Sequence, residues 1–471
     1  MVTTAVTGLK YCSVKLSDAI ARGNRIDASA FDVDAMRMRE LVEKCQFGVR
    51  HLGTLLDDVY YGARLKRHYV EPVRDDVIGL LGSSEMLDCY PQPVKFMVED
   101  AANADFRVKN GTVLVSRSGT IGNVTFVSKT LEKYLVSEHS IRLECKEFPG
   151  YVYAYLRTAV GKALVKSNTF GAVVNQIEPE HMKQVLVPNA PIDIQEQVNE
   201  LVMRSYALRD ESNDLVDEAT ALMVDALSLP PIHELDCDLY RKDAGVDTFS
   251  VKLSDMSGRA DASYHVPVVE AIIEHLQRHA GEMTTVGDTR ISKEVILPGR
   301  FKRVYVEEGH GVTFIGGKQL WEIDPANKKF LSNVKHGDLI SETLMLHEGM
   351  TLITCSGTIG KVAMVPKHWE GWAANQHIIR VAPANDGISG YLNVFLASDY
   401  GRELIRRYTY GSVIDEITDD HVRSIPVPLL ADADAQREIN DLMLQANAKR
   451  FEAYELEQEA IRIVNEDVLG L

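Results

Sequence analysis

The strongest constraint on the fold of this chain is that its sequence is written twice. Motifs of the first half return in the second half in the same order, at an offset that stays between about 234 and 241 residues. The matched segments are Ser13–Asp18 with Ser250–Asp255, Lys66–Glu71 with Lys302–Glu307, Ser118–Gly122 with Ser356–Gly360, Glu138–Arg142 with Gln376–Arg380, Phe170–Gly171 with Tyr410–Gly411, Glu180–His181 with Asp420–His421, and Val187–Pro188 with Val427–Pro428. Because chance does not keep so many matches collinear, we interpret the chain as two copies of one unit, roughly 13–249 and 250–471.

The first part of each copy is rich in valine, isoleucine and glycine and predicts a mixed α/β globule. Short apolar runs between glycine turns are typical of strands. The expected strands are Gly111–Val115, Val124–Val127, Thr351–Thr354 and Val362–Val365, and the expected helical stretches are Tyr151–Lys166 and Tyr391–Arg407.

The second part of each copy predicts a long amphipathic helix. Residues 194–226 and 435–466 contain neither glycine nor proline, and their apolar residues recur every 3.5 positions. The polar members of this stripe are Ser205, Ser212 and Lys449. Each helix would span ~50 Å at about 1.5 Å per residue. Antiparallel pairing of the two would make a coiled coil with a globule at each end, a twofold pseudosymmetric tandem repeat.

Composition describes an ordinary protein of roughly two to four domains. The chain has 471 residues, no apolar run long enough for a membrane helix, and no basic-then-apolar leader at its start. Its six cysteines are scattered without a CxxC pair, which argues against zinc and a disulfide scaffold and favours a reducing cytoplasm.

The net charge of −17 argues at first against nucleic acid, but the acid is concentrated in the helical segments. Residues 191–249 carry 4 basic and 14 acidic side chains, a net of −10, and residues 431–471 carry 4 and 10, a net of −6. Residues 1–190 and 250–430 have nets of +2 and −3. A near-neutral globule can still present a local basic patch. The acidic helix faces are either solvated surface or docking faces for a partner.

Two repeated motifs are candidate DNA contacts. The Ser-Gly-Thr-Ile-Gly turn could place hydroxyls and backbone amides against phosphates, or its glycines could serve backbone geometry alone. The basic cluster could pair with guanine and phosphate, or be a solvated strand end. Its members are Arg64, Lys66, Arg67 and their equivalents Arg300, Lys302 and Arg303, with Tyr69 and Tyr305 close behind.

The histidines carry weaker signals. His139 and His377 occupy equivalent places, which suggests a role, although satisfied core histidines fit as well. His275 and His279 lie four residues apart on an expected helix, but no third metal ligand is evident.

Known catalytic signatures are absent from the sequence. Gly317–Gln319 and Gly360–Val362 lack the rest of a phosphate-binding loop, and His347–Thr351 lacks the second histidine of a zinc protease. GxSxG and the Asn/Asp-Pro-Pro-aromatic motif of amino-methyltransferases do not occur. A binding protein is therefore favoured over a stand-alone enzyme.

The order of these features resembles a known family over essentially the whole chain. A globule, a Ser-Gly-Thr-Ile-Gly turn, a stretch ending in His181 or His421, a Val-Pro turn and a long helix starting near Gln195 or Gln436 all appear twice. This is similar to the specificity (S) subunit of type I restriction–modification enzymes.

The resemblance implies an architecture, partners and a function. It implies a first target-recognition domain at 1–190 with a helical spacer at 191–235, and a second at 236–430 with a spacer at 431–471. It implies double-stranded DNA, methyltransferase (M) subunits, two of them expected, and motor-nuclease (R) subunits as partners. S-adenosylmethionine and ATP with Mg²⁺ would bind to those partners, and no cofactor is expected in this chain. Two different heads predict a bipartite asymmetric site with an unread spacer.

Carried over position by position, the family's turn maps to Ser116–Thr120 and Thr354–Thr358. Cys355 stands where the first copy has Arg117, and Lys361 stands where it has Asn123. The expected DNA-binding residues of the turns are Ser116, Arg117, Ser118, Thr120, Ser356, Thr358 and Lys361, in addition to the basic cluster.

Two functions from different classes remain open. The first is a DNA-reading scaffold. The second is a protein-interaction scaffold whose modules no longer contact DNA, which the acidic total charge and the exchange of Arg117 for Cys355 favour. Charge reversal at Lys66 and Arg67 would separate them, because it weakens DNA binding only under the first.

Overall fold

Contacts along the chain divide it into two units, and each takes a segment from both long helices. The first unit comprises Met1–Asp210 and Glu452–Leu471, and the second unit comprises Glu211–Phe451. The computed structural model describes residues 2–4, 10–21, 31–64, 67–72, 76–100, 105–168, 176–235, 241–243, 246–256, 258–411 and 413–471.

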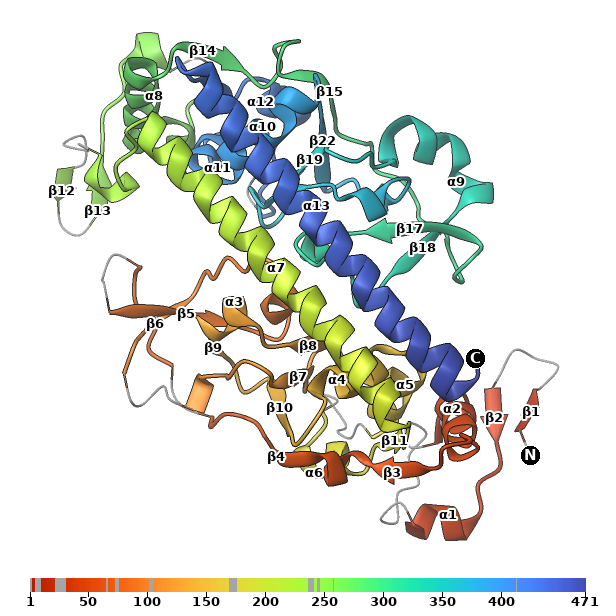
Figure 1. The fold of residues 1–471 in the computed structure, drawn as a ribbon. Coiled ribbons are helices and arrows are strands. Elements are labelled where there is room, and N and C mark those ends of the chain that lie inside the picture. The colour runs from red at the N-terminus through yellow and green to blue at the C-terminus, as the bar shows by residue number, and fades with distance from the viewer. Residues whose placement is uncertain are drawn as a thin grey trace. The chain divides into compact units, whose positions relative to one another are not determined.

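The first unit is a mixed α/β fold (Figure 1). Its elements are β1 (Val2–Thr4), β2 (Lys10–Cys12), α1 (Leu16–Ala21), α2 (Val33–Glu43), β3 (Val49–His51), β4 (Leu56–Tyr60), β5 (Val77–Leu81), β6 (Phe96–Val98), β7 (Val113–Ser116), β8 (Val124–Phe126), α3 (Lys129–Glu132), β9 (Leu135–Val136), β10 (Ser140–Cys145), α4 (Pro149–Arg157), α5 (Ala159–Ser167), α6 (Pro179–Lys183), β11 (Leu186–Pro188) and the first part of α7 (Ile192–Ala226).

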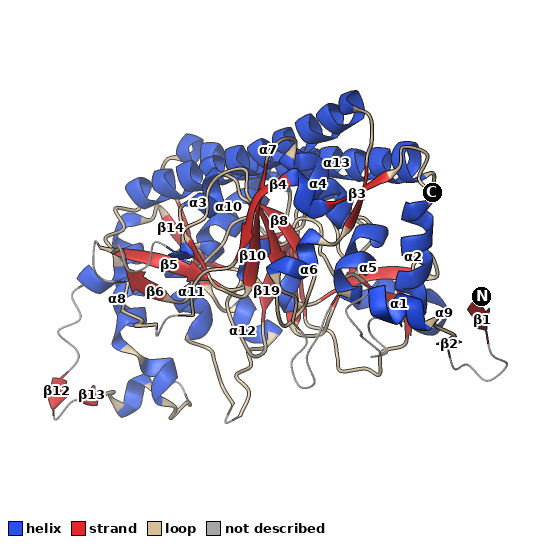
Figure 2. Cartoon of the chain, turned by 90° about the horizontal axis from the view of Figure 1, so that it is seen from below, coloured by secondary structure: helices blue, strands red, loops and turns tan. Residues whose placement is uncertain are grey.

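The centre of the first unit is an antiparallel sheet of order β4-β10-β7-β8 (Figure 2). Strands β7 and β8 of this sheet are fully buried, which explains their continuous apolar runs. Helix α4 packs on this sheet, with Tyr151 and Tyr155 in the same core as Val115 and Ile141. A smaller sheet pairs β5 with β6 in antiparallel and with β9 in parallel orientation.

The second unit contains a corresponding set of elements. They are β12 (Arg241–Asp243), β13 (Val246–Thr248), α8 (Pro267–His279), β14 (Glu282–Thr285), β15 (Ser292–Ile296), β16 (Tyr305–Val306), β17 (Gly311–Ile315), β18 (Lys329–Ser332), α9 (Asn333–Leu339), β19 (Thr351–Thr354), β20 (Val362–Met364), β21 (Ala373–Ala374), β22 (Ile378–Pro383), α10 (Asp386–Ala397), α11 (Asp399–Arg406), α12 (Asp419–Arg423), β23 (Pro426–Leu429) and most of α13 (Ala433–Ile463).

The sheets of the second unit have the strand order of those in the first. Its central sheet is β15-β22-β19-β20, matching β4-β10-β7-β8. Its second sheet pairs β17 with β18 in antiparallel and with β21 in parallel orientation, as β5 pairs with β6 and β9. The strands expected at Thr351–Thr354, Val362–Val365, Gly111–Val115 and Val124–Val127 are confirmed to within two residues at each end.

Each expected helical stretch after the central sheet is two helices rather than one. The break lies at Thr158 in the first unit and at Ser398 in the second, and each side-chain oxygen accepts the backbone N–H of the glycine three residues later. A hydroxyl at this position caps the N-terminus of the second helix. The close approach of that glycine to the preceding helix leaves no room for a Cβ at Gly161 or Gly401.

The Val-Pro motif before each long helix is held by a buried tyrosine. Tyr151 donates to the carbonyl oxygen of Pro188 at 2.9 Å, and Tyr391 donates to that of Pro428 at 2.6 Å. In both units an asparagine of the long helix accepts backbone N–H groups at the start of the helix that carries this tyrosine, through Asn199 Oδ1 and Asn440 Oδ1. The long helix is therefore fixed to its globule by the same bonds in both units.

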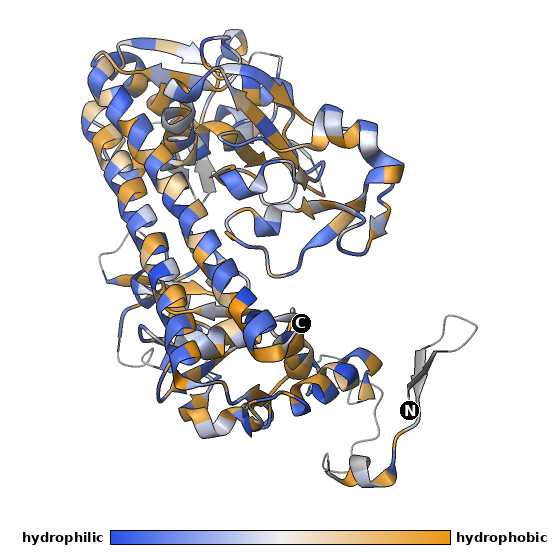
Figure 3. Cartoon of the chain, turned by 45° about the vertical axis from the view of Figure 1, so that its right-hand side comes forward, coloured by the Kyte–Doolittle hydropathy of each residue, from blue (hydrophilic) through white to orange (hydrophobic). Residues whose placement is uncertain are grey.

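Both long helices form where the hydrophobic stripe predicted them, and blue and orange residues alternate along them in Figure 3. The last expected turn differs, because residues 464–469 form a π-helical turn after α13. In each unit a part of α7 lies beside a part of α13 that runs in the opposite direction (Figure 1).

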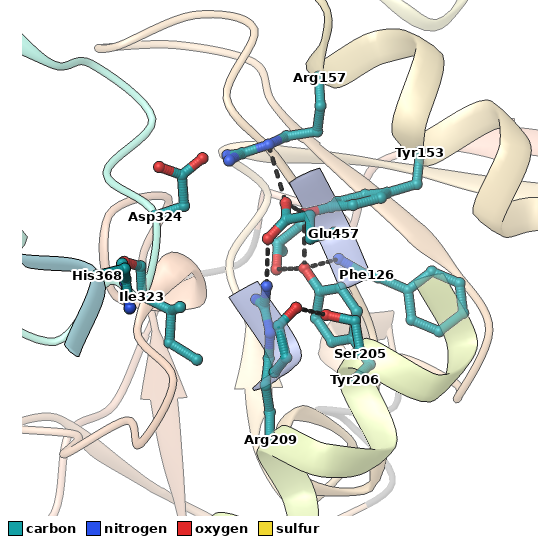
Figure 4. A network of polar contacts seen from close by, with 12 residues as sticks. Phe126, Tyr153, Arg157, Ser205, Tyr206, Arg209, Ile323, Asp324, His368 and Glu457 are labelled. Atoms are coloured by element: carbon teal, nitrogen blue, oxygen red, sulfur yellow. Dashed lines mark hydrogen bonds and ion pairs between the residues drawn. The ribbon is translucent and has the colours of Figure 1, made fainter. Parts of the chain in front are cut away.

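In the first unit, the helix pair buries a polar network (Figure 4). Ser205 of α7 donates to the carbonyl oxygen of Ala453 at 2.7 Å. Glu457 of α13 pairs with Arg157 of α4 and Arg209 of α7, and it accepts the hydroxyl of Tyr153. Glu457 is almost completely buried, and its two arginine partners supply counter-charges inside the fold.

In the second unit, the polar positions of the stripe find partners across the pair. Lys449 donates to Glu211 at 2.6 Å, and Arg450 Nε donates to the hydroxyl of Ser212 at 3.4 Å. The apolar positions Ala219, Ile439 and Ala446 are buried. Among the residues that the structure describes, no helix has both the length and the apolar character that crossing a membrane requires.

Candidate nucleic-acid interface

The Ser-Gly-Thr-Ile-Gly turn joins β7 to β8 and β19 to β20, and its glycines are required by the backbone. Gly119 and Gly122 have φ of 76° and 81°, and Gly357 and Gly360 have φ of 75° and 85°. Side chains other than glycine rarely adopt this left-handed region. The repeated glycines thus have a structural cause, whatever the turn contacts.

The hydroxyl of the residue at the start of the turn forms hydrogen bonds within the turn. Ser116 is buried, and its hydroxyl donates to the carbonyl oxygen of Thr120 and accepts the N–H of Asn123 at 2.8 Å. In the second unit Thr354 accepts the N–H of Lys361 in the same way at 2.9 Å. The expected DNA contact at Ser116 therefore falls on a hydroxyl that is already occupied within the turn.

The tip of each turn faces solvent. Thr120 and Thr358 are exposed together with their neighbouring glycines. Ser118 is buried with its hydroxyl 2.7 Å from Nδ1 of His139, while its equivalent Ser356 is half-buried. Of the turn residues expected to bind DNA, the two threonines present the freest hydroxyls.

Arg117 does not present its guanidinium on the surface. It is buried, ion-paired with Glu178, and its guanidinium carbon lies 4.2 Å from the ring centroid of Tyr61. Cys355 is likewise buried at the equivalent place, and burial raises the pKa of its thiol to about 12. The exchange between the two copies therefore replaces an internal ion pair by a small apolar side chain.

In the second unit, the basic cluster lies on the approach to β16. Arg300 is 79% exposed and pairs with Glu416 at 2.9 Å. Lys302 is exposed. Arg303 is half-buried and donates to Oε1 of the neutral amide Gln376 at 2.8 Å, and its guanidinium carbon lies 5.7 Å from the ring centroid of Phe314.

In the first unit, the equivalent cluster carries a carboxylate. Arg64 is exposed, and Lys66 lies outside the described residues. Arg67 pairs with Glu138 and donates to the hydroxyl of Tyr69 at 3.4 Å. Burial alone would raise the pKa of Glu138, but the hydrogen bond and charge of Arg67, a backbone hydrogen bond and the charge of His139 together lower it. The pair is therefore ionic at neutral pH.

The segment that leads into β10 or β22 brings the basic cluster beside the turn. The backbone N–H of Arg117 donates to the carbonyl oxygen of His139 at 2.8 Å, and that of Cys355 to His377 at 3.0 Å. Glu138 and Gln376, which hold the arginines of the cluster, directly precede those histidines. Two motifs that are far apart in sequence thus form one surface in each unit.

The histidines of this surface differ between units. His139 is exposed and contacts Ser118. His377 is half-buried, and burial followed by the charges of Arg303 and Arg300 lowers its pKa. Its imidazole is therefore neutral at pH 7, chiefly because it is half-buried and also because Arg303 and Arg300 repel a positive charge there.

Lys361 is half-buried, with Nζ 4.2 Å from the ring centroid of Trp321. The arginines that follow the repeated histidines in the Ile-Arg motif are not on the surface. Arg142 and Arg380 are fully buried and donate to backbone carbonyls, and burial lowers the pKa of Arg380 to about 9. Arg142 and Arg380 are therefore internal side chains that hydrogen-bond to the backbone.

His275 and His279 stack at 4.1 Å, and each contacts a backbone carbonyl oxygen, that of Leu227 and that of His275 respectively. No group of three potential metal ligands occurs in the part of the chain that the structure describes.

Sequence reasoning missed two further side chains at this surface, Lys95 and Lys329. Each lies over the ring of the tyrosine in its own basic cluster, Tyr69 or Tyr305. The signal was present, because the dipeptide Lys95–Phe96 returns as Lys329–Phe330. It was too short to distinguish from chance before the strand pairing was known.

One comparison with known proteins matches a segment that lies mostly in the second unit. Residues 317–459 match the family described as Type I restriction modification DNA specificity domain. The S subunit of a type I restriction-modification system from M. genitalium is 13% identical, with a TM-score of 0.34 over 91% of this chain and 96% of that chain. The HsdS subunit from Thermoanaerobacter tengcongensis is 14% identical, with a TM-score of 0.28 over 90% and 96%. No curated protein matches the sequence. Residues 317–459 of this chain are therefore similar to the family described as Type I restriction modification DNA specificity domain.

Proposed function

We propose that the chain is the DNA-reading subunit of a cytoplasmic type I restriction–modification complex. Each unit reads one half of a bipartite, asymmetric DNA site, and the long helices form the antiparallel coiled coil that joins the two pseudosymmetric heads. The chain itself is non-catalytic. Methylation and cleavage belong to partner subunits that bind S-adenosylmethionine and ATP with Mg²⁺.

The observation that carries this proposal is that internal hydrogen bonds of the family-matched segment recur in the first unit, outside that segment. The match to the family covers only residues of the second unit and the start of the C-terminal helix segment of the first. Yet the first unit ties its turn to His139 and its Val-Pro motif to Tyr151 by the same bonds that tie the second unit's turn to His377 and motif to Tyr391. We infer two specificity domains in one chain.

The surfaces of the two units have the same backbone arrangement but different charges. This supports the proposal that the two units read half-sites of different sequence. The arginine equivalent in the two clusters is held by a carboxylate, Glu138, in one unit and by an amide, Gln376, in the other. Contacts with phosphates position a protein on DNA, whereas contacts with base edges specify sequence, so differences between the two surfaces change which base edges each accepts.

The methyltransferase subunits are proposed to dock on the acidic helical segments, and the motor-nuclease subunits to join them in the full complex. Residues 191–249 have a net charge of −10, while the globule before them is near neutral. Two methyltransferase subunits would match two similar docking faces, one for each copy of the repeat.

Selection of DNA by the assembled complex tests the proposal. The chain, purified with its methyltransferase subunit, is incubated with duplexes of random sequence, and bound duplexes are sequenced. One bipartite motif with a constant spacer is expected, and its affinity should fall steeply with salt. Absence of any enriched motif would count against DNA reading.

The alternative is a protein-interaction scaffold that no longer contacts DNA. Burial of Ser116 and Arg117 favours it, because two expected contacts are occupied inside the turn. Reversing the exposed charges at Arg300 and Lys302 separates the two functions. DNA affinity should drop at least tenfold under the DNA-reading function, whereas unchanged affinity with intact methyltransferase binding would support the scaffold.

A further inference from the structure

We propose that Tyr69 with Lys95, and Tyr305 with Lys329, form a repeated clamp for a phosphate of the DNA backbone, one clamp in each unit. The inference rests on the proposed function, because it assigns a specific contact within the same DNA-binding surface. The ligand group is a phosphodiester of duplex DNA, bound by the tyrosine hydroxyl and the lysine ammonium together.

The two pairs share one strand register. In the second unit Tyr305 lies opposite Leu331 in the antiparallel pairing of β16 with β18, so Lys329 is its diagonal neighbour. In the first unit Val70 bridges to Phe96, with its N–H 3.0 Å from the phenylalanine carbonyl oxygen. Val70 and Phe96 correspond to Val306 and Phe330, which are also paired. The side chains meet by the same cross-strand geometry in both units.

The distances between the paired groups agree closely. Lys95 Nζ lies 5.6 Å from the ring centroid of Tyr69, and Lys329 Nζ lies 5.2 Å from that of Tyr305. Each tyrosine stands two residues after an arginine of the basic cluster, Arg67 or Arg303, and Arg67 donates to the hydroxyl of Tyr69. Each tyrosine ring thus lies beside a lysine ammonium, and the hydroxyl of Tyr69 also contacts a guanidinium.

Stability does not explain why these side chains recur. Tyr69 is 48% exposed and Tyr305 is 43% exposed, and both lysines are exposed as well. An exposed cation–π contact contributes only about 0.5–1 kcal/mol. Large aromatic rings exposed at equivalent places in two diverged copies are better explained by a ligand. Tyrosine and lysine are both phosphate-binding side chains in protein–DNA complexes.

The identity of the pair in both units points to phosphate rather than to a base. Positions that differ between the units, such as Glu138 and Gln376, are suited to reading half-sites that differ. A contact with the same chemistry in both units must recognise something that both half-sites share. The sugar–phosphate backbone is the part of DNA that is independent of sequence.

The test uses the full chain in complex with its methyltransferase subunit. Lys95→Gln, Lys329→Gln, Tyr69→Phe and Tyr305→Phe are each titrated with the preferred duplex and with a scrambled duplex across a range of salt concentrations. Matched controls are Lys146→Gln and Lys293→Gln, which remove exposed lysines at the far ends of β10 and β15 from the basic clusters. Thermal unfolding verifies that every variant is folded.

Each lysine variant should weaken binding to both duplexes by the same factor and reduce the slope of log affinity against log salt by about 0.9. Each tyrosine variant should weaken both by roughly tenfold to a hundredfold, the loss expected for one hydrogen bond to a charged group. The controls should bind like the unaltered complex.

Two results would overturn the clamp. Lysine variants that bind like the controls would show that the pair does not touch DNA. A changed ratio of specific to scrambled affinity would assign the pair to a base edge instead. Failure of the proposed function has a different signature, because the unaltered complex would then show no preferred duplex, and equal weakening on scrambled DNA would still support the clamp.

Discussion

At the residue scale, the side chain that accepts a hydrogen bond from the cluster arginine changes the charge of each proposed DNA-binding surface. Glu138 pairs with Arg67 as a carboxylate, whereas Gln376 accepts from Arg303 as a neutral amide. The first surface is therefore less positive than the second by one charge at this place, and the difference is open to direct exchange.

Glu138→Gln should tighten DNA binding by up to about tenfold, since it removes one screened negative charge beside the phosphates. Gln376→Glu should weaken binding by a similar factor. Fluorescence anisotropy of the complex with a labelled duplex measures both, and high salt should shrink both effects. A shift in the same direction for the two variants would be inconsistent with this assignment.

Arg303→Gln should raise the pKa of His377. Burial lowers that pKa first, and the nearby guanidinium groups of Arg303 and Arg300 lower it further by repelling the imidazolium form. Removing one guanidinium weakens the repulsion, so protonation becomes easier and the pKa moves toward its ordinary value. Titration of the imidazole by NMR measures the shift, and an unchanged or lower pKa would show that burial alone sets it.

The candidate DNA-binding residues chosen from the sequence fall into two groups, those that are exposed and those that are buried. The exposed members Thr120, Thr358 and Lys302 need no partner inside the fold, so pattern alone could find them. The role of Arg117 could not be predicted, because its burial depends on Glu178 and on the ring of Tyr61, which reach it only through the folded chain.

At the element scale, the turn between β19 and β20 owes its sequence to backbone conformation. Gly357 has a positive φ, and a Cβ there would meet no other atom within 4 Å. Gly357→Ala should therefore cost about 1–2 kcal/mol of unfolding free energy from the backbone alone.

Gly337 in α9 is the matched control, since it has equally open space but no left-handed φ. Gly337→Ala should be neutral or stabilise by up to about 1 kcal/mol, because alanine favours a helix over glycine. Chemical denaturation of both variants measures the contrast. Equal effects would remove backbone strain as the reason for the glycine.

The long helix α13 carries a second contrast, between a buried and an exposed glutamate. Glu457→Gln leaves Arg157 and Arg209 without their buried counter-charge and should cost about 3–5 kcal/mol. Glu459→Gln, which removes an exposed pair with Arg462, should cost less than about 1 kcal/mol. Similar costs in thermal or chemical unfolding would mean that the network in Figure 4 does not stabilise the first unit.

The elements were largely predictable because each follows from a local pattern. Period 3.5 marked α7 and α13, and apolar runs between glycines marked β7, β8, β19 and β20. The breaks at Thr158 and Ser398 were missed, because a capping hydroxyl between two apolar stretches looks like one polar position in a continuous helix.

At the scale of the whole molecule, duplication gives the chain two surfaces that are built from equivalent turns and basic clusters. The repeat could be found by sequence because motifs stay collinear over the full length. What each surface reads could not, since base recognition depends on side-chain placement that has no simple code. Substitutions confined to one unit should therefore relax one half-site only.

Mapping of methylated adenines in DNA exposed to the assembled complex tests this two-headed account most directly. The unaltered complex should methylate a motif of two different half-sites separated by a spacer of constant length. Arg303→Gln should relax the base preference in one half-site and leave the other half-site and the spacer unchanged. A single continuous motif, or relaxation of both half-sites by that one substitution, would contradict the account.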